Sequence, residues 1–313
     1  MRMRKHFATG AAMAAAATMV LTACGGGSST STSTSSSSSS DSGAPKGTIT
    51  VGSAYETTDY GPITTSALGI GADWQVLEGL YRFDMSDYSV TPALAAGDPV
   101  KVSDTKYEIT LRDGAKFSDG TDVKAADVVS SYERTTDEKS IYRQFFTFVD
   151  SVEAKDDKTV TITLKHPFAA LKERFVNVRV VPSSMSADEL KSKPIGSGPY
   201  KFDNISATEV TAVPNEHYNG KIPAKAATLK WSVLKDDSPR LSAALGGSID
   251  IMEAVPADAA DKLKAANWTV DSKPGYGNPV MMFNTQKAPF DKPAVRRAFL
   301  TAIDKQKLAS AAL

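Results

Sequence analysis

Few of the side chains that carry metal or catalytic chemistry occur at useful spacings in this chain of 313 residues. Beyond the first few residues, the histidines are His166, just before a proline, and His217, in a polar loop. A dedicated first-row metal site normally gathers three or four ligands. Two histidines so far apart in the sequence therefore predict no metal site.

Hydrolytic and dinucleotide chemistry are equally poorly supported. A hydrolase needs a nucleophile, a base and an orienting acid, yet no serine stands in a Gly-x-Ser-x-Gly elbow between a strand and a helix. Gly196-Ser197-Gly198-Pro199 reads better as a turn, because proline follows where a helix would begin. Gly69-Ile70-Gly71 lacks the third glycine and the acidic partner of a dinucleotide site. We expect a protein that is not an enzyme and uses no cofactor.

Cys24 is the one residue near the N-terminus with specific chemistry, and it is the only cysteine in the chain. A lone cysteine cannot form an internal disulfide. It follows Leu21-Thr22-Ala23 at the end of an uncharged apolar stretch, with three basic residues among the first five of the chain. That order is typical of a signal peptide and is too short for a comfortable bilayer span. Residues 1–23 resemble a bacterial lipoprotein signal, which implies lipidation of Cys24 and a membrane anchor; a plain secretory peptide is the alternative.

Residues 24–46 are rich in Gly, Ser and Thr and predict a flexible tether, with a span of roughly 25 Å. The whole chain has 36 basic and 36 acidic residues, so loss of the three basic residues of the signal leaves a net charge near −3. That charge provides no basic surface for nucleic acid. No second apolar run is long enough to cross a membrane.

The rest of the chain alternates between short strand and helix patterns. Period-two alternation and β-branched residues predict strands over residues 46–54, 107–112, 149–155, 158–165, 200–204, 209–213, 229–234, 249–252 and 280–284. Apolar residues at helical spacing predict helices over residues 72–80, 123–134, 168–175, 238–245, 256–265 and 293–303. We therefore expect a mixed α/β fold.

The last residues predict a second helix that begins after Asp304, its cap, and is still in progress at Leu313. The pattern contains no glycine or proline stop there. We interpret this as a truncated chain, and we expect the last helix to be poorly ordered on its own.

Several segments, in order, resemble the family 5 extracytoplasmic solute-binding proteins, the peptide- and nickel-binding proteins of ABC importers. The segments lie at residues 76–81 (VLEGLY), 91–95 (TPALA), 111–127 (LRDGAKFSDGTDVKAAD), 194–202 (PIGSGPYKF), 247–250 (GSID), 283–285 (FNT) and 289–304 (PFDKPAVRRAFLTAID). The third is the most specific, because a strand, a tight turn and a helix start follow one another there. The chain departs from the family pattern at Asp59-Tyr60-Gly61-Pro62, where the family has Leu-Asp-Pro.

The resemblance implies a periplasmic-binding-protein-like α/β fold with two lobes and an extra subdomain in lobe I. Lobe I is expected over residues 47–290, its subdomain over about 78–183, and the start of lobe II over residues 291–313, with the second lobe largely missing. A cleft binder encloses its ligand from both sides, so we expect the chain by itself to bind poorly.

The function that the resemblance implies is binding of a solute, an oligopeptide first of all, for an ABC-type importer. Its permease subunits, the ligand and the anchoring membrane are the expected partners, with a monomer on the extracytoplasmic face. Nickel or a metal chelate and a sugar are alternative ligands within the family. A degenerate surface lipoprotein without a transport role is the alternative from another class.

The ligand contacts are inferred from position relative to the family motifs and from nearness to the interlobe crossing. The candidates are Thr65, Ser66, Ala67, Tyr142, Glu253, Tyr276 and Asn278. Residues 65–67 would hold an extended peptide through main-chain hydrogen bonds, and an ordinary surface loop is the alternative. Tyr142 would face the cleft, or would be structural. Glu56 and Asp59 stay unassigned.

Overall fold

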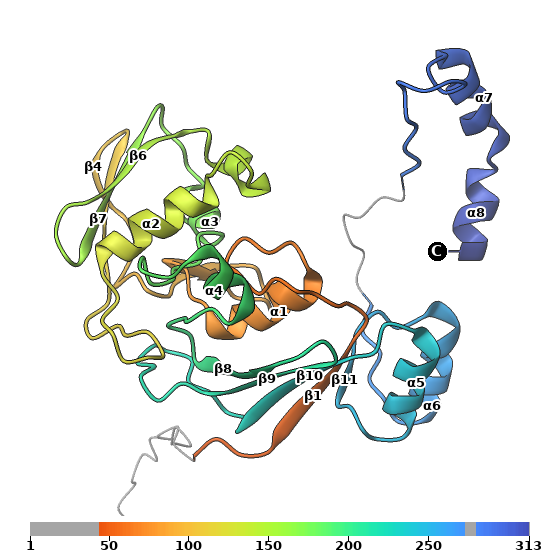
Figure 1. The fold of residues 1–313 in the computed structure, drawn as a ribbon, viewed down its shortest axis with the longest axis horizontal. Helices are drawn as coiled ribbons and strands as arrows, with labels where there is room; N and C mark the ends of the chain where they lie inside the picture. Colours follow the sequence, from red (N-terminus) through yellow and green to blue (C-terminus); the bar gives the residue numbers. More distant parts are fainter. Residues whose placement is uncertain (1–43, 273–279, 313) are drawn as a thin grey trace, which may run out of the picture. The chain divides into compact units, whose positions relative to one another are not determined.

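The computed structural model describes residues 44–272 and 280–312, with side chains described up to residue 308. The described residues form a mixed α/β fold of short helices and strands, as the sequence predicts (Figure 1). Within these ranges no helix has both the length and the apolar composition needed to cross a membrane.

The first sheet has five strands in the order β11-β1-β10-β9-β8. β1 lies parallel to both β10 and β11, whereas β10, β9 and β8 run antiparallel to one another. The bounds are Thr48–Ser53 for β1, Tyr200–Ile205 for β8, Glu209–Pro214 for β9, Thr228–Val233 for β10 and Ile251–Met252 for β11. All five strands fall in or overlap segments for which the sequence predicts a strand, so these predictions are confirmed.

Helix α1 (Ala67–Val76) packs against this sheet. Its Leu68, Ala72 and Val76 are buried and recur every four residues, which places them on one face of a helix. They share a core with the inward side chains of the sheet, including Phe202 and Trp231. This packing holds α1 over the sheet and so positions the polar residues on the rest of its surface.

The expected helix over residues 72–80 is therefore wrong at both ends. α1 begins five residues earlier, and Leu77 is already extended, with φ −104° and ψ 131°. The carbonyl of Val76, the last residue of the helix, accepts a hydrogen bond of 2.8 Å from the main chain of Gly198, which satisfies a group that has no partner within the helix. A Cβ at Gly196 or Gly198 would collide with the Val76 backbone, so the close approach of this turn requires glycine.

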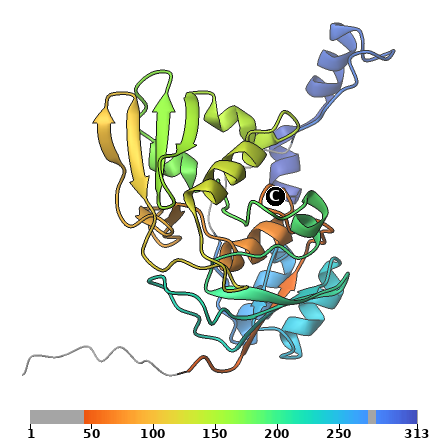
Figure 2. The same ribbon diagram turned by 60° about the vertical axis from the view of Figure 1, so that its left-hand side comes forward.

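The second sheet is antiparallel, with four strands in the order β4-β5-β7-β6. Figure 2 shows its strands side by side with helix α2 along one face. The bounds are Val100–Ser103 for β4, Lys106–Thr110 for β5, Val149–Ala154 for β6, Thr159–Leu164 for β7 and Ala125–Thr135 for α2. The β6–β7 hairpin confirms the prediction, and its turn is held by two main-chain N–H groups that donate to Asp156 Oδ1 at 2.8 Å.

Aromatic side chains fill the core beneath α2. Tyr132 of α2 stacks on Phe175 with ring centroids 6.0 Å apart, and Phe146 meets both rings edge-on at 5.6 Å. The remaining elements around this core are β2 (Tyr81–Phe83), β3 (Val90–Pro92), the 3₁₀ helix η1 (Ile141–Phe146) and α3 (Leu171–Phe175). The core is built from residues between Leu80 and Val180 and is separate from the core beneath α1.

The other helices cover the edges of the fold. Their bounds are Ala187–Ser192 for α4, Asp237–Leu245 for α5, Ala257–Ala259 for the 3₁₀ helix η2 and Ala260–Ala265 for α6. α5 and α6 enclose a small third core with Ile249 and Met252. Gly247, shortly after the end of α5, is left-handed, at φ 71°, a conformation that glycine adopts without strain.

The C-terminal segment contains α7 (Pro293–Ala302) and α8 (Lys305–Ala312). The main chain of Lys307 donates to Asp304 Oδ1 at 3.0 Å, which confirms Asp304 as the cap of α8. The predicted strand over residues 280–284 is wrong, because in the described part of the chain this segment has no neighbouring strand to take its backbone hydrogen bonds. Phe283 instead packs its ring against Phe290 and Phe299.

Candidate functional site

Trp74 of α1 and Arg179, which follows α3, form a stacked pair in the walls of two pockets. The Arg179 guanidinium lies 4.9 Å from the centroid of the Trp74 ring, a favourable cation–π arrangement. Both residues line a pocket of about 110 Å³ and another of about 150 Å³. We call the smaller one the Asp73 pocket and the larger one the Glu78 pocket.

The Asp73 pocket is formed by the segment before α1, by α1 itself, by η1 and by the segment after α3. Its lining residues are Pro62, Thr64, Ile70, Asp73, Trp74, Tyr142, Asn177 and Arg179. Small-molecule sites are usually lined by aromatic and apolar side chains, with a few polar groups that orient the ligand.

Asp73 is 3% exposed, and its Oδ1 has no hydrogen-bond donor within the described residues. Burial raises the pKa of the Asp73 carboxyl well above its ordinary value; the Arg179 charge opposes this shift and Asp59 adds to it. Desolvation thus favours the neutral acid. A carboxyl group in this state is unusual for a helix that packs on a sheet.

Arg179 is half-buried and makes neither a hydrogen bond nor an ion pair with any residue of 44–272 or 280–308. Burial lowers the pKa of the Arg179 guanidinium to about 10, while Asp73 and Tyr142 act in the opposite direction. The group therefore stays cationic at neutral pH. The Asp73 pocket thus contains a positive charge whose hydrogen-bonding capacity is unused.

Tyr142, one of the residues predicted to contact ligand, lines the same pocket. Its hydroxyl donates to the carbonyl of Thr64 at 3.1 Å, which joins η1 to the segment before α1. Burial raises the pKa of the Tyr142 phenol, with Arg179 opposing and Asp73 adding to the shift. Tyr142 is therefore placed beside the predicted peptide-contact segment.

That segment, Thr65, Ser66 and Ala67, forms the entry to α1. Thr65 and Ala67 are exposed, and Ser66 is the N-cap, although its side chain accepts no capping hydrogen bond. The Ser66 hydroxyl instead donates to the carbonyl of Glu56 at 3.3 Å. The segment is an accessible loop next to the Asp73 pocket, and its role in binding stays a prediction.

Glu253 lies just beyond the carboxyl ends of the parallel strands β1 and β11, an edge where α/β sheets often bind ligands. Its carboxylate accepts from the Ser53 hydroxyl at 2.7 Å, and its main-chain N–H donates to Gly52 at 3.1 Å. The carboxylate is thus already engaged with the end of β1. Tyr276, Asn278 and Cys24, the other residues predicted to act, lie outside the described residues.

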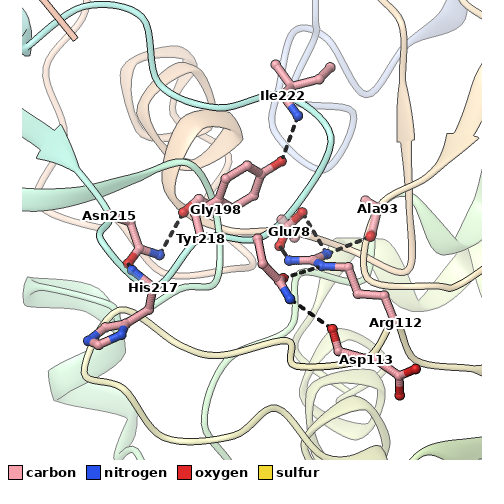
Figure 3. Close-up of polar contacts among 10 residues, drawn as sticks. Glu78, Ala93, Arg112, Asp113, Gly198, Asn215, His217, Tyr218 and Ile222 are labelled. Atoms are coloured by element: carbon pink, nitrogen blue, oxygen red, sulfur yellow. Dashed lines mark hydrogen bonds and ion pairs between the residues drawn. The ribbon is translucent and has the colours of Figure 1, made fainter. Parts of the chain in front are cut away.

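The Glu78 pocket contains a buried ion pair. Figure 3 shows Arg112 against Glu78, with both guanidinium NH groups donating to the carboxylate at 2.8 and 3.1 Å. The same arginine donates to the carbonyl of Ala93 at 2.6 Å. Burial raises the pKa of Glu78, and the Arg112 charge and hydrogen bond oppose that shift. The hydrogen bonds of this pair are satisfied, so we interpret it as structural.

The loop after β9 closes one wall of the Glu78 pocket. Asn219 accepts from Arg112 Nε at 2.9 Å, and the Tyr218 ring lies 5.6 Å from the Arg112 guanidinium. The imidazole of His217 points away from the ion pair (Figure 3). Among residues 44–272 and 280–312, no group of three or more His, Cys, Asp or Glu side chains is arranged to hold a metal ion.

Sequence reasoning missed Asp73, Trp74 and Arg179. A usable signal was present, because Arg179 interrupts the apolar run from Val178 to Val181 and Asp73 interrupts an otherwise apolar helix. A charge inside a buried segment is either paired or functional. Only the fold shows that these two charges reach the same pocket.

Comparison with known proteins settles the family. The sequence model described as bacterial extracellular solute-binding proteins, family 5 Middle, matches residues 89–313. The chain belongs to this family. Its curated relatives include the glutathione-binding protein GsiB of Salmonella typhi, 29% identical over 84% of this chain and 53% of the relative, and that of Escherichia coli K12, 27% identical over the same shares. The family 5 chain therefore spans about half the length of the curated relatives it matches.

Solved structures agree on the fold. AgaA from A. tumefaciens R10, in complex with agropinic acid, is 27% identical with a TM-score of 0.69, over 82% of this chain and 54% of its own. DppA from Helicobacter pylori, in complex with the peptide STSA, is 21% identical with a TM-score of 0.69, over 84% of this chain and 58% of its own. This family 5 chain thus has the α/β fold of periplasmic binding proteins and corresponds to about half of their two-lobed structure.

Proposed function

We propose that this chain binds a solute outside the cytoplasm for an ABC-type importer and that the solute is an oligopeptide. Membership of the family 5 extracellular solute-binding proteins supports the first part. For the second part, the ligands of its relatives and structural neighbours include glutathione, the peptide STSA and a nonapeptide bound to AppA from Bacillus subtilis. The importer's permease subunits are the proposed partners.

The observation that carries the proposal is the Asp73 pocket and its position. It opens beside the accessible residues 65–67, and Tyr142 connects the two through its hydrogen bond to Thr64. An extended peptide could take main-chain hydrogen bonds from residues 65–67 and place an end group in the pocket. Ser66, Tyr142 and Glu253 are therefore kept as proposed contacts, together with Thr65, Ala67, Tyr276 and Asn278.

We further propose that residues 47–290 form lobe I, that its subdomain covers about residues 78–183, and that residues 291–313 begin lobe II. The two separate cores, one from residues between Leu80 and Val180 and one around α1 and the five-stranded sheet, support this division. Cys24 would carry the lipid anchor on the extracytoplasmic face, with residues 24–46 as its tether. A monomer is sufficient for this role.

Mass spectrometry of the small molecules carried through purification of the protein tests the proposed cargo. Peptides should be the class enriched over a mock purification, at the low occupancy expected of a chain that binds poorly by itself. A Tyr142→Phe variant should retain less of them, because the hydrogen bond to Thr64 is lost. Enrichment of a metal chelate or a sugar in place of peptides would contradict the oligopeptide proposal. Conversion of a peptide during incubation would contradict a binding role.

A further inference from the structure

The Asp73 pocket contains two polar groups that the chain brings together without pairing them. Asp73 is buried and its Oδ1 has no donor within the described residues. In the same part of the chain Arg179 has no acceptor and forms no ion pair with Asp73. A buried polar group is normally hydrogen-bonded, because an unmade bond is unfavourable. A third group that satisfies both is the simplest explanation of this arrangement.

The unpaired guanidinium of Arg179 indicates which chemical group of a ligand would bind in the Asp73 pocket. Burial raises the pKa of the Asp73 carboxyl, which disfavours its charged form beside the Arg179 cation. Glu78, which lines the neighbouring pocket, is already paired with Arg112. Asp59, the charged neighbour of Asp73, does not line the Asp73 pocket. Arg179 therefore lines the pocket without an ion-pair partner among the described residues, and a planar guanidinium binds a carboxylate through two parallel hydrogen bonds. Asp73 can in turn accept a hydrogen bond from an N–H group.

The size of the pocket limits how far apart the two ligand groups can be. A water molecule takes up roughly 30 Å³ in the liquid, so a pocket of about 110 Å³ has room for one small head group or a few waters. The carboxylate and the N–H must then be attached to the same carbon atom, as they are in any amino acid residue with a free carboxyl end.

We infer that the Asp73 pocket is a subsite for the terminal carboxylate of a peptide, with Arg179 donating to the carboxylate and Asp73 accepting from the N–H of the same residue. Trp74 holds the guanidinium in place by stacking on it. The inference deepens the proposed function and rests on it for the source of the carboxylate. A free amino acid or an N-acylated amino acid carries the same chemistry.

N-acetylglycine is a suitable probe, because it has the carboxylate and the adjacent N–H and little else. The chain contains three tryptophans, so ¹⁵N-tryptophan labelling gives three indole N–H signals, and Trp74 can report on its own pocket. We expect N-acetylglycine to shift the Trp74 signal saturably while Trp231 and Trp268 stay unchanged. N-acetylglycinamide, which lacks the charge, and acetate, which lacks the N–H, should each bind at least tenfold more weakly.

Two variants test the two proposed contacts, that of Arg179 with the carboxylate and that of Asp73 with the N–H. Arg179→Gln should abolish the preference for N-acetylglycine over its amide, and Asp73→Leu should abolish the preference for N-acetylglycine over acetate. Arg143→Gln, an exposed arginine on η1, is the matched control and should bind like the unmodified protein. Unchanged Trp231 and Trp268 signals show that each variant is folded.

The outcomes separate this inference from the proposed function. Equal binding of N-acetylglycine and its amide, or unaltered binding by Arg179→Gln, would overturn the subsite. No shift of Trp74 with any probe would mean that the pocket holds only water. If trialanine binds but the probes and variants show no carboxylate preference at the Asp73 pocket, the subsite is refuted and the oligopeptide proposal is retained. Glycine and trialanine distinguish a free amino acid from a peptide end as the source of the carboxylate.

Discussion

Arg240 and Arg179 are both withdrawn from solvent, yet only Arg240 has its hydrogen bonds satisfied within the chain. Its guanidinium is 1% exposed and donates to four main-chain carbonyls, with bonds of 2.7 to 3.0 Å to Leu234, Lys235, Glu253 and Ala254. Arg240 therefore joins segments of the chain, whereas the guanidinium of Arg179 is available to a ligand.

Replacement of Arg240 by alanine should be strongly destabilising. The change leaves several carbonyls between β10, α5 and β11 without donors in a buried place, and loss of a buried charged partner typically costs about 3–5 kcal/mol. Urea unfolding followed by circular dichroism measures this directly. Arg143→Ala, at an exposed site, should change the free energy of unfolding by no more than about 0.5 kcal/mol. Similar small effects for both would show that the Arg240 bonds contribute little.

Asp73→Leu should stabilise the protein, and more at neutral than at acidic pH. Burial raises the folded-state pKa of Asp73 above its ordinary value of 3.8, so the folded state holds a proton that the unfolded state releases as pH rises. The unmodified protein therefore loses stability above pH 3.8 until the folded-state pKa is reached, with Arg179 and Asp59 as the charged neighbours. Removing the unpaired acceptor should add about 1–3 kcal/mol at pH 7. Urea unfolding at pH 4 and pH 7 checks this, and a pH-independent difference would contradict it.

At the scale of elements, the β6–β7 hairpin and β1 follow directly from alternation and turn residues in the sequence. The limits of α1 do not, because the apolar spacing continues through Leu77 and Leu80 into the segment after the helix. The carbonyl at the end of α1, that of Val76, is hydrogen-bonded by Gly198, more than a hundred residues later in the sequence. Likewise, Tyr142 could be proposed from position alone, whereas its hydrogen bond to Thr64 depends on how the subdomain folds back on α1.

Two glycines test this account of α1. Gly198→Ala should destabilise the protein by about 2–3 kcal/mol, because its Cβ would meet backbone atoms of Gln75 and Val76. Gly71→Ala, inside α1 and facing open space, should instead stabilise it by about 0.5–1 kcal/mol through the higher helix propensity of alanine. Thermal unfolding of the two variants should shift the midpoint in opposite directions. A stable Gly198→Ala protein would refute the close approach.

For the whole molecule, the two larger cores meet at the candidate site. α1 is anchored in the core of the five-stranded sheet, whereas Tyr142 and Arg179 come from segments bordering the core of the four-stranded sheet. A pocket at the junction of two separately packed regions is a common position for ligand sites. The family 5 fold could be recognised from short sequence segments, but the pocket follows only from the packing of these two cores.

The central claim is that this family 5 chain binds a peptide at the Asp73 pocket. A titration of ¹⁵N-tryptophan-labelled protein with trialanine, with glucose and a nickel–histidine complex as comparisons, tests it most directly. The account predicts a shift of the Trp74 indole signal that saturates only at high trialanine concentration, in keeping with the poor binding expected of the chain by itself, and no shift with the other two. A saturable shift with glucose or the nickel complex and none with trialanine would contradict it.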